Sequence, residues 1–446
     1  MLELSDSDRG SDLPSAKESR FARVWNAFDG LASDTLWSMG HDVLVLVTAL
    51  ISFKVLQTLP LERYGAYVGL HSALAIVGAM SYAGGGLALL QRLLGERADL
   101  VESTDSFLSL ALMAGSGSVV AVTLIAPAFF PLTRWEIFLL TTAELLGAAM
   151  VFVCAMAVQG SSGFGAATRI RMGAIGLRFA ITIGLGISGR LSVLGVASGF
   201  CFVLLLYSLY LLIFHLPKSG YVFLFKSPSK AAVSSTTMFS MPMGASGLQT
   251  DGDKVMLNAF GFSSEAGLYG AAYRVLTIGI APLMALDTAA FQRFLPRGDG
   301  EPGLHWRRSI RMGALMLGAS TFVVAGIYLF LPLFEMVLLG DGEYKNAVEI
   351  VPWLLPIIPL IATSNTPMNG LLGLGLPRLR MNIYLVSALV SVVLYFLLIP
   401  VWGWRGAVAA TIISEVILSI IGWGALWVAQ RSADAQSTTV NESLQV

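Results

Sequence analysis

Long apolar segments and short polar connections alternate along the chain from about residue 36 to residue 430. Each apolar segment is close to the ~20 residues that an α-helix needs to cross a bilayer. The pattern predicts twelve transmembrane helices, near residues 37–58, 65–91, 107–130, 135–158, 172–189, 191–214, 236–262, 266–292, 309–331, 350–373, 380–401 and 406–428. Four prolines interrupt the tenth segment, which is therefore expected to be broken.

The composition supports this pattern. Hydrophobic residues make up 55% of the 446 residues, charged residues make up 13%, and the mean hydropathy is +0.74. A soluble domain has about 25% charged residues. We therefore expect an all-α polytopic membrane protein. The formal net charge is zero, so the overall charge gives no reason to expect a nucleic-acid partner.

Several kinds of chemistry are not indicated by the sequence. Cys154 and Cys201 lie inside apolar segments, as expected of small buried side chains rather than of a disulfide or a metal pair. The four histidines are scattered and have no metal-ligand spacing. The chain has no GxxxxGK motif followed by Ser or Thr, which excludes ATP hydrolysis by a P-loop. We expect no cofactor, no bound metal and no enzymatic activity.

Positive charge is distributed unequally between the two sides of the predicted bundle. With a cytoplasmic N-terminus, nineteen Lys and Arg residues lie on the inner side and five lie on the outer side. Cytoplasmic loops carry the excess of Lys and Arg in membrane proteins. Both termini are therefore predicted to be cytoplasmic.

The chain contains an internal repeat. ERYGAY at 62–67 matches EAGLY at 265–269, and GFGAATRIRM at 163–172 matches GLGLPRLRM at 373–381. Each unit has six helices, so both units enter the membrane from the same side, as in a parallel repeat. We expect two six-helix halves around a central cavity, with the substrate site between the halves.

The repeat defines the predicted domains. The N-terminal bundle covers 36–214 and the C-terminal bundle covers 236–430, with a cytoplasmic linker at 215–235 and polar tails at 1–35 and 431–446. In the first tail, four apolar residues share one helical face: Phe21, Trp25, Phe28 and Ala32. This tail is either an amphipathic helix on the inner membrane surface or an unstructured segment.

A cluster of charges lies at bilayer depth in the stretch 249–274, which is predicted to form a helical hairpin. Asp251, Asp253 and Lys254 are in its first arm and Arg274 is in its second. A charge at the bilayer centre costs at least ~2.5–3.5 kcal/mol, so such residues face a protein interior or a water-filled cavity. Asp251 and Lys254 share a helical face, whereas Asp253 is expected to point elsewhere.

Two interpretations of this hairpin remain open. In the first, Lys254 and Arg274 bind an anionic headgroup such as a pyrophosphate, and the aspartates set their charge or bind a coupling cation. In the second, Asp253 and Arg274 form a buried pair that only stabilises the hairpin.

Four further ionisable residues lie within apolar segments. Glu144 and Glu415 are candidate proton or sodium sites, or else accept a hydrogen bond from a neighbour such as Thr141 or Ser414. Arg178 has no acid at helical spacing, so its partner must come from another helix, and it is a candidate cavity cation. Asp287 is either a gate residue or an interfacial charge.

The hairpin and three other features resemble a known family. Asp253-Lys254 with Gly267, Tyr269, Ala272 and Arg274 resembles the conserved hairpin of the Wzx-type O-antigen flippases, in the multidrug/oligosaccharidyl-lipid/polysaccharide exporter superfamily. The turn 61–65 and the last two helices, with 399–400, Gly403, 406–409, Thr411 and Glu415, also resemble this family. The resemblance covers roughly residues 36–430.

The resemblance implies a flippase of the cell inner membrane that moves a polyprenyl-pyrophosphate-linked oligosaccharide to the outer leaflet for surface polysaccharide synthesis. Alternating access, coupled to a proton or sodium gradient, is expected. Its implied partners are the lipid-linked oligosaccharide, the coupling cation, membrane lipids and other polysaccharide assembly proteins. One alternative is a cation-coupled multidrug or metabolite exporter of the same superfamily. The second is a membrane glycan polymerase or ligase, against which the short outer loops argue.

Overall fold

The computed structural model describes residues 37–95, 99–219, 221, 227–291, 303–340 and 342–443, and all regular elements within these ranges are helices. The N-terminal half begins with a helix at Trp37–Leu56. It continues with α2 (Leu61–Gly78), η1 (Ala79–Ala83), α3 (Gly84–Gly95), α4 (Leu100–Ile125), η2 (Ala126–Ala128), α5 (Arg134–Thr142), η3 (Ala143–Ala148), α6 (Ala149–Ser162), α7 (Phe164–Ile187), α8 (Val193–Tyr210), η4 (Leu211–His215) and η5 (Leu216–Ser219).

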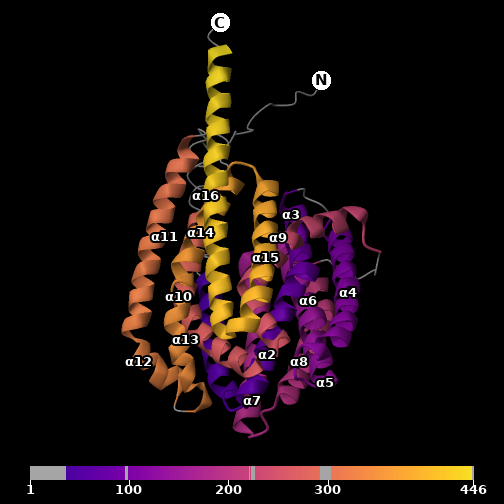
Figure 1. Ribbon diagram of the computed structural model, residues 1–446. Coiled ribbons are helices and arrows are strands. Elements are labelled where there is room, and N and C mark those ends of the chain that lie inside the picture. Colours follow the sequence, from indigo (N-terminus) through magenta and orange to yellow (C-terminus); the bar gives the residue numbers. More distant parts are fainter. Residues whose placement is uncertain are drawn as a thin grey trace, which may run out of the picture.

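The C-terminal half contains α9 (Lys230–Ala259), α10 (Ser263–Phe291), α11 (Gly303–Leu329), α12 (Leu331–Phe334), η6 (Glu335–Leu339), η7 (Glu343–Asn346), α13 (Ala347–Leu354), α14 (Ile357–Gly373), α15 (Pro377–Trp402) and α16 (Trp404–Ser443). Figure 1 shows the long helices of both halves lying roughly along one axis of the bundle, with α16 extending beyond it. The predicted amphipathic segment within 1–35 lies outside the described residues.

The expected twelve helices are present in this all-helical bundle. In the described part of the chain, nine helices are long and apolar enough to cross a membrane, and a broken pair bent by 47° makes a tenth. The break falls at Pro356, which confirms the effect expected from the prolines. The remaining two predicted spans are α9 and α10, with 30 and 29 residues.

Several helix ends differ from the predicted ends. The fifth helix, α7, begins at Phe164 rather than near 172, and cation–π contacts lie along its first two turns. Arg171 lies 5.4 Å from the Phe164 ring centroid and Arg169 lies 5.6 Å from that of Trp37. At the other end of the chain, helix α16 continues through the predicted tail to Ser443.

In the described part of the chain, three membrane-spanning helices contain a π-helical segment, and in one of them this segment, η4, forms the end of the span after α8. η1 lies between α2 and α3, and η3 lies between α5 and α6. A π-helical turn holds one residue more than an α-helical turn, so it rotates the next part of the helix, and such turns are frequent at functional sites. η3 contains Glu144.

The two halves meet closely at one end of the bundle, where α2 packs against α9 and α10. Gly65 and Gly267, which are equivalent residues of the repeat, lie at this contact. A Cβ built on Gly65 would be 1.8 Å from the Ser263 carbonyl oxygen, and one on Gly267 would be 2.6 Å from that of Leu61. The side-chain amide of Asn258 also donates to the Gly65 carbonyl at 3.1 Å. The repeat therefore brings its own two turns into direct backbone contact.

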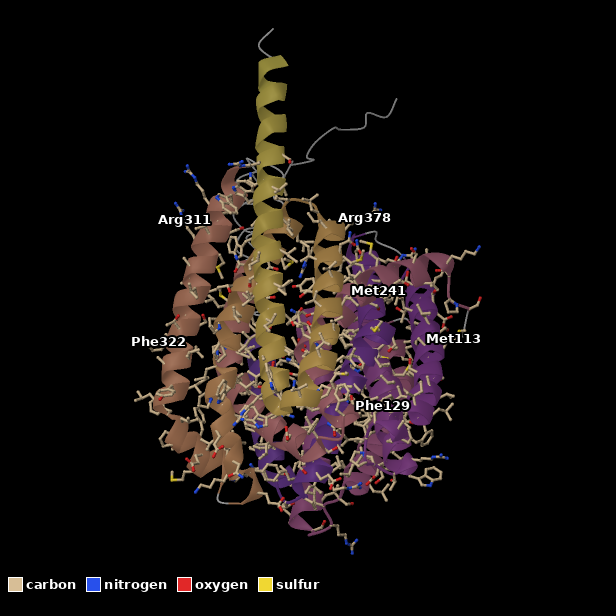
Figure 2. The ribbon with its side chains drawn as sticks, viewed as in Figure 1. Met113, Phe129, Met241, Arg311, Phe322 and Arg378 are labelled. Carbon is tan, nitrogen blue, oxygen red and sulfur yellow. The ribbon has the colours of Figure 1, made fainter. Side chains whose placement is uncertain are left out.

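The opposite end of the bundle carries predicted cytoplasmic cations. Arg311 on α11 and Arg378 on α15 lie near the end from which α16 protrudes (Figure 2). Both belong to the set of cations that the positive-inside bias assigns to the cytoplasmic side.

Candidate functional site

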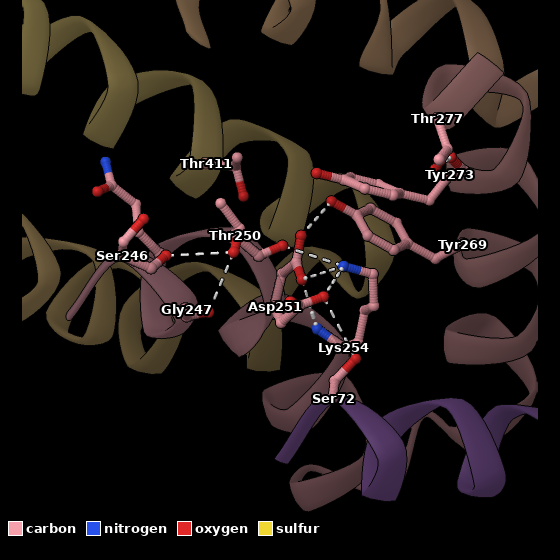
Figure 3. Close-up of polar contacts among 12 residues, drawn as sticks. Ser72, Ser246, Gly247, Thr250, Asp251, Lys254, Tyr269, Tyr273, Thr277 and Thr411 are labelled. Atoms are coloured by element: carbon pink, nitrogen blue, oxygen red, sulfur yellow. Dashed lines mark hydrogen bonds and ion pairs between the residues drawn. The ribbon is translucent and has the colours of Figure 1, made fainter. Parts of the chain in front are cut away.

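The hairpin predicted at 249–274 is formed by α9 and α10, joined by a short turn at Phe260–Phe262. Gly261 has a φ of 84°, a conformation that favours glycine, and this lets the chain reverse in three residues. The turn places Asp253 and Lys254 on α9 beside Tyr269 and Tyr273 on α10 (Figure 3).

Lys254 has a complete set of acceptors. Its Nζ donates to Asp251 Oδ1 at 2.9 Å and to the Thr250 carbonyl oxygen at 3.0 Å, and lies 3.4 Å from Asp253 Oδ1. The ammonium also lies 3.9 Å from the centroid of the Tyr273 ring. An ammonium has three donors, and all three are used within the hairpin. Lys254 is 4% exposed, so its charge acts through these partners.

Asp253 only partly follows the prediction that it points away from Lys254. Its Oδ2 turns toward α10 and accepts from the Tyr269 hydroxyl at 2.5 Å, but its Oδ1 stays within ion-pair distance of Lys254. The reason is that Oδ1 also accepts the backbone N–H of Lys254 at 2.7 Å, which holds the carboxylate beside the ammonium. Asp253 is fully buried.

The proposed Asp253–Arg274 pair is not formed among the described residues, where Asp253 pairs with Lys254. Arg274 interacts electrostatically with Tyr64 and Tyr67 on α2 and with Asp251 on α9. This second cation of the hairpin therefore faces the N-terminal half of the protein.

A second charged cluster lies in the N-terminal half. Arg178 Nη2 on α7 donates to Glu144 Oε2 in η3 at 2.8 Å, which confirms that the partner of Arg178 comes from another helix. The guanidinium also lies 5.7 Å from the centroid of the Phe200 ring. Thr141, the expected neighbour of Glu144, instead donates to the Ile137 carbonyl oxygen.

His71 on α2 belongs to this cluster, although its spacing predicted no role. Its Nδ1 lies 3.8 Å from Glu144 Oε1. Its ring stacks on Tyr67 with centroids 6.0 Å apart. An ionisable residue inside an apolar segment is a functional candidate in its own right, and that signal would have identified His71.

The two clusters are related by the repeat. Tyr67 and His71 on α2 correspond to Tyr269 and Tyr273 on α10, 202 residues later. The second ring pair also stacks, with centroids 6.2 Å apart. In each half, this ring pair lies beside the buried carboxylate of that half, Glu144 or Asp253.

Three of these charged side chains are partly accessible. The exposed fractions of the side chains are 40% for His71, 34% for Asp251 and 26% for Arg178. Electrostatic interactions join His71 to Glu144 and Arg178 on one side and to Asp251 and Arg274 on the other. These groups therefore belong to one electrostatically coupled set that draws residues from both halves.

The remaining candidates, Glu415 and Asp287, accept hydrogen bonds within the C-terminal half. Glu415 Oε2 on α16 accepts from Ser364 on α14 at 3.0 Å, while Ser414 donates to the Ala410 carbonyl oxygen. Asp287 Oδ1 on α10 accepts from the Asn369 side-chain amide at 3.1 Å. Both carboxylates therefore join one helix of this half to another.

No protein-family model matches the chain, and no curated protein matches it in sequence. Solved structures do resemble it. An inward-facing multidrug resistance transporter of the MATE family, in the MOP superfamily, has a TM-score of 0.68 at 15% identity, over 91% of this chain and 96% of that chain. An outward-facing structure of such a transporter has a TM-score of 0.61 at 16% identity, over the same shares.

A third similar structure is the MATE multidrug transporter DinF-BH. It has a TM-score of 0.61 at 17% identity, over 95% of this chain and 98% of that chain. The chain thus has the fold of MOP-superfamily transporters over almost its whole length.

Proposed function

We propose that this protein is a flippase that carries an anionic, lipid-linked oligosaccharide from the cytoplasmic to the outer leaflet of the cell inner membrane. The observation that carries the proposal is a pair of arginines from opposite halves that both act electrostatically on His71. Arg178 belongs to the N-terminal half and Arg274 to the C-terminal half. A pyrophosphate between the sugar and lipid parts of one molecule needs such cations, and Arg is the side chain best suited to bind it.

The other hairpin charges have supporting roles in this proposal. Lys254 has its three donors occupied, so it contributes positive potential and would contact the headgroup only after Asp251 moves away. Asp251 and Asp253 set that charge. The sugar remains in the polar space between the halves while the polyprenyl tail stays in lipid, since only the headgroup is costly to move through the bilayer.

Transport proceeds by alternating access of the two halves. The close contact at Gly65 and Gly267 seals one end of the bundle, and this end is the outer one in the predicted orientation. The carboxylates Glu144, Glu415 and Asp287 within the helical bundle are the candidate sites for a driving proton or sodium ion, because ionisable groups inside a membrane protein mark such pathways.

The test removes charge from each half separately. Arg178→Gln and Arg274→Gln are expected to abolish surface glycan and to leave polyprenyl-linked units on the inner leaflet. The amount of each variant in the membrane is measured in parallel, so that loss of transport is distinguished from loss of protein. Arg311→Gln is the matched control, because Arg311 is exposed at the cation-rich end of the bundle. Normal glycan output from both cavity variants would contradict the proposed role of these arginines.

Multidrug export is the second candidate, because the similar structures are named as multidrug transporters. A strain in which the gene is deleted distinguishes the two functions. A multidrug exporter predicts that deletion of the gene lowers drug resistance and leaves surface glycan intact, whereas a flippase predicts the reverse.

A further inference from the structure

His71 has an unusual position for a residue without an assigned role. Its side chain is 40% exposed, but its Nδ1 is buried and has no hydrogen-bond partner among the described residues. Glu144 Oε1, 3.8 Å away, is buried and equally without a partner. A buried polar atom without a partner costs about 1–3 kcal/mol, and here two such atoms face each other.

A proton on His71 would satisfy both atoms. A charge-assisted hydrogen bond between imidazolium and carboxylate needs a separation of about 2.7–2.9 Å, so a movement of about 1 Å is sufficient. Arg178 need not move, because it binds the other oxygen of the same carboxylate, Oε2. Glu144 can therefore hold Arg178 and a protonated His71 at the same time.

The surrounding charges make this proton significant for an anion. The four charged side chains that act most strongly on His71 come from four elements: Glu144 in η3, Arg178 on α7, Asp251 on α9 and Arg274 on α10. Two are anionic and two are cationic, so their formal charges cancel. The uncharged aromatic neighbour of the ring is Tyr67. A proton on His71 therefore adds a full unit of positive charge to a balanced environment.

The repeat gives an independent reason to single out this position. The equivalent residue in the C-terminal half is Tyr273, whose ring lies over the ammonium of Lys254. Lys254 is held by two carboxylates, which keep it charged. Thus the C-terminal half carries a permanent cation at this level, whereas the N-terminal half carries a histidine, the side chain whose charge changes between about pH 5 and 8.

We propose that His71 is the group that takes up a proton when an anion of the phosphate class binds between the halves. This inference rests on the proposed function and specifies its binding step. The proton comes from the aqueous phase and is held between His71 Nδ1 and Glu144 Oε1. It moves in the same direction as the anionic headgroup. Because this proton occupies Glu144, the separate driving ion is assigned to Glu415 or Asp287.

The experiment measures binding of farnesyl diphosphate to the purified, full-length protein in detergent by calorimetry, at several pH values between about 5 and 8. Uptake of one proton per anion makes the Kd rise by up to about tenfold for each pH unit. His71→Gln should lose this part of the pH dependence. The titration of the diphosphate itself is common to both proteins and cancels in the comparison.

His41→Gln is the matched control, since His41 lies in the first helix and pairs with Asp42 at 3.1 Å. It should keep the pH dependence of the unmodified protein. If His71→Gln does not fold, the unmodified protein still decides the matter, because binding enthalpies in buffers of different ionisation enthalpy count the protons taken up. About one proton per anion is expected beyond the uptake by the ligand.

The two possible failures are distinguishable. This inference is overturned if the diphosphate binds with an equal pH dependence to the unmodified protein and to His71→Gln. It is also overturned if the diphosphate binds without protein-linked proton uptake. Either result leaves the flippase assignment standing. No binding of the diphosphate at any pH would overturn both.

Discussion

The contact between the two turns of the repeat makes a sharp prediction for Gly65→Ala. The new Cβ would lie 1.8 Å from the Ser263 carbonyl oxygen, whereas ordinary contacts begin at 3.4 Å. The backbone segments must therefore separate by about 1.6 Å. Overpacking of this kind typically costs about 1–3 kcal/mol. The higher helix propensity of Ala does not offset this cost, because α2 is expected to be helical in the closed and open states alike.

This cost applies only to the closed state, in which the turns of the two halves are in contact at the outer end. The ratio of the closed population to the open population should therefore drop by about 5–150-fold. Leu59 is a suitable reporter because it is 7% exposed and its carbonyl oxygen accepts the Tyr344 hydroxyl at 3.1 Å. The reporter protein carries Leu59→Cys, with Cys154 and Cys201 replaced by Ala. Adding Gly65→Ala to this protein should increase its rate of reaction with a membrane-impermeant maleimide by a similar factor.

Two further variants calibrate this measurement. Gly267→Ala should act in the same direction but less strongly, because its Cβ would be 2.6 Å from the Leu61 carbonyl oxygen. Gly184→Ala on α7 has no atom within 4 Å of the new Cβ and should leave the labelling rate unchanged. An unchanged rate in folded Gly65→Ala protein would refute the idea that this contact holds the outer end closed.

Three other expectations concern the buried polar groups. Arg178→Gln leaves Glu144 charged and unpaired, and should lower stability by about 3–5 kcal/mol; thermal unfolding in detergent should show a smaller loss when Glu144→Gln is combined with it. Tyr269→Phe removes the donor to Asp253 and should cost about 1.5–3 kcal/mol in the same assay, whereas an unchanged Tm would argue against that hydrogen bond. Glu415→Gln should uncouple transport from the driving ion gradient while diphosphate binding persists, and gradient-dependent flipping in proteoliposomes would contradict the coupling role.

Much of the architecture follows from the sequence because a bilayer permits so few solutions. A spanning segment must satisfy its backbone hydrogen bonds internally, so segments of about 20 apolar residues become helices. The twelve helices and the broken tenth helix were predictable in this way. The repeat at 62–67 and 265–269 was visible from the matching sequence segments. The need for partners around Asp251, Lys254 and Arg178 was predictable too, because isolated charges are costly at this depth.

The identity of those partners required the tertiary structure. Each residue along a helix turns the side-chain direction by about 100°, so the sequence fixes which residues share a face but not which face meets which neighbour. Arg178 and Glu144 are 34 residues apart on elements whose relative rotation depends on the packing of the whole half. The π-helical turn η3 rotates part of its span further, and no sequence pattern indicated it.

The hairpin at 249–274 shows the same division. Its sequence alone predicted that Asp251, Asp253, Lys254 and Arg274 lie at bilayer depth, because they fall within segments of spanning length. Only the tertiary structure decided that Lys254 is enclosed by its own helix and by Tyr273, while Arg274 faces α2 in the other half. His71 became a candidate for the same reason, since its importance comes from a carboxylate on another helix. Depth in the membrane is a property of one helix, but an interaction between charges depends on how two helices are rotated and spaced.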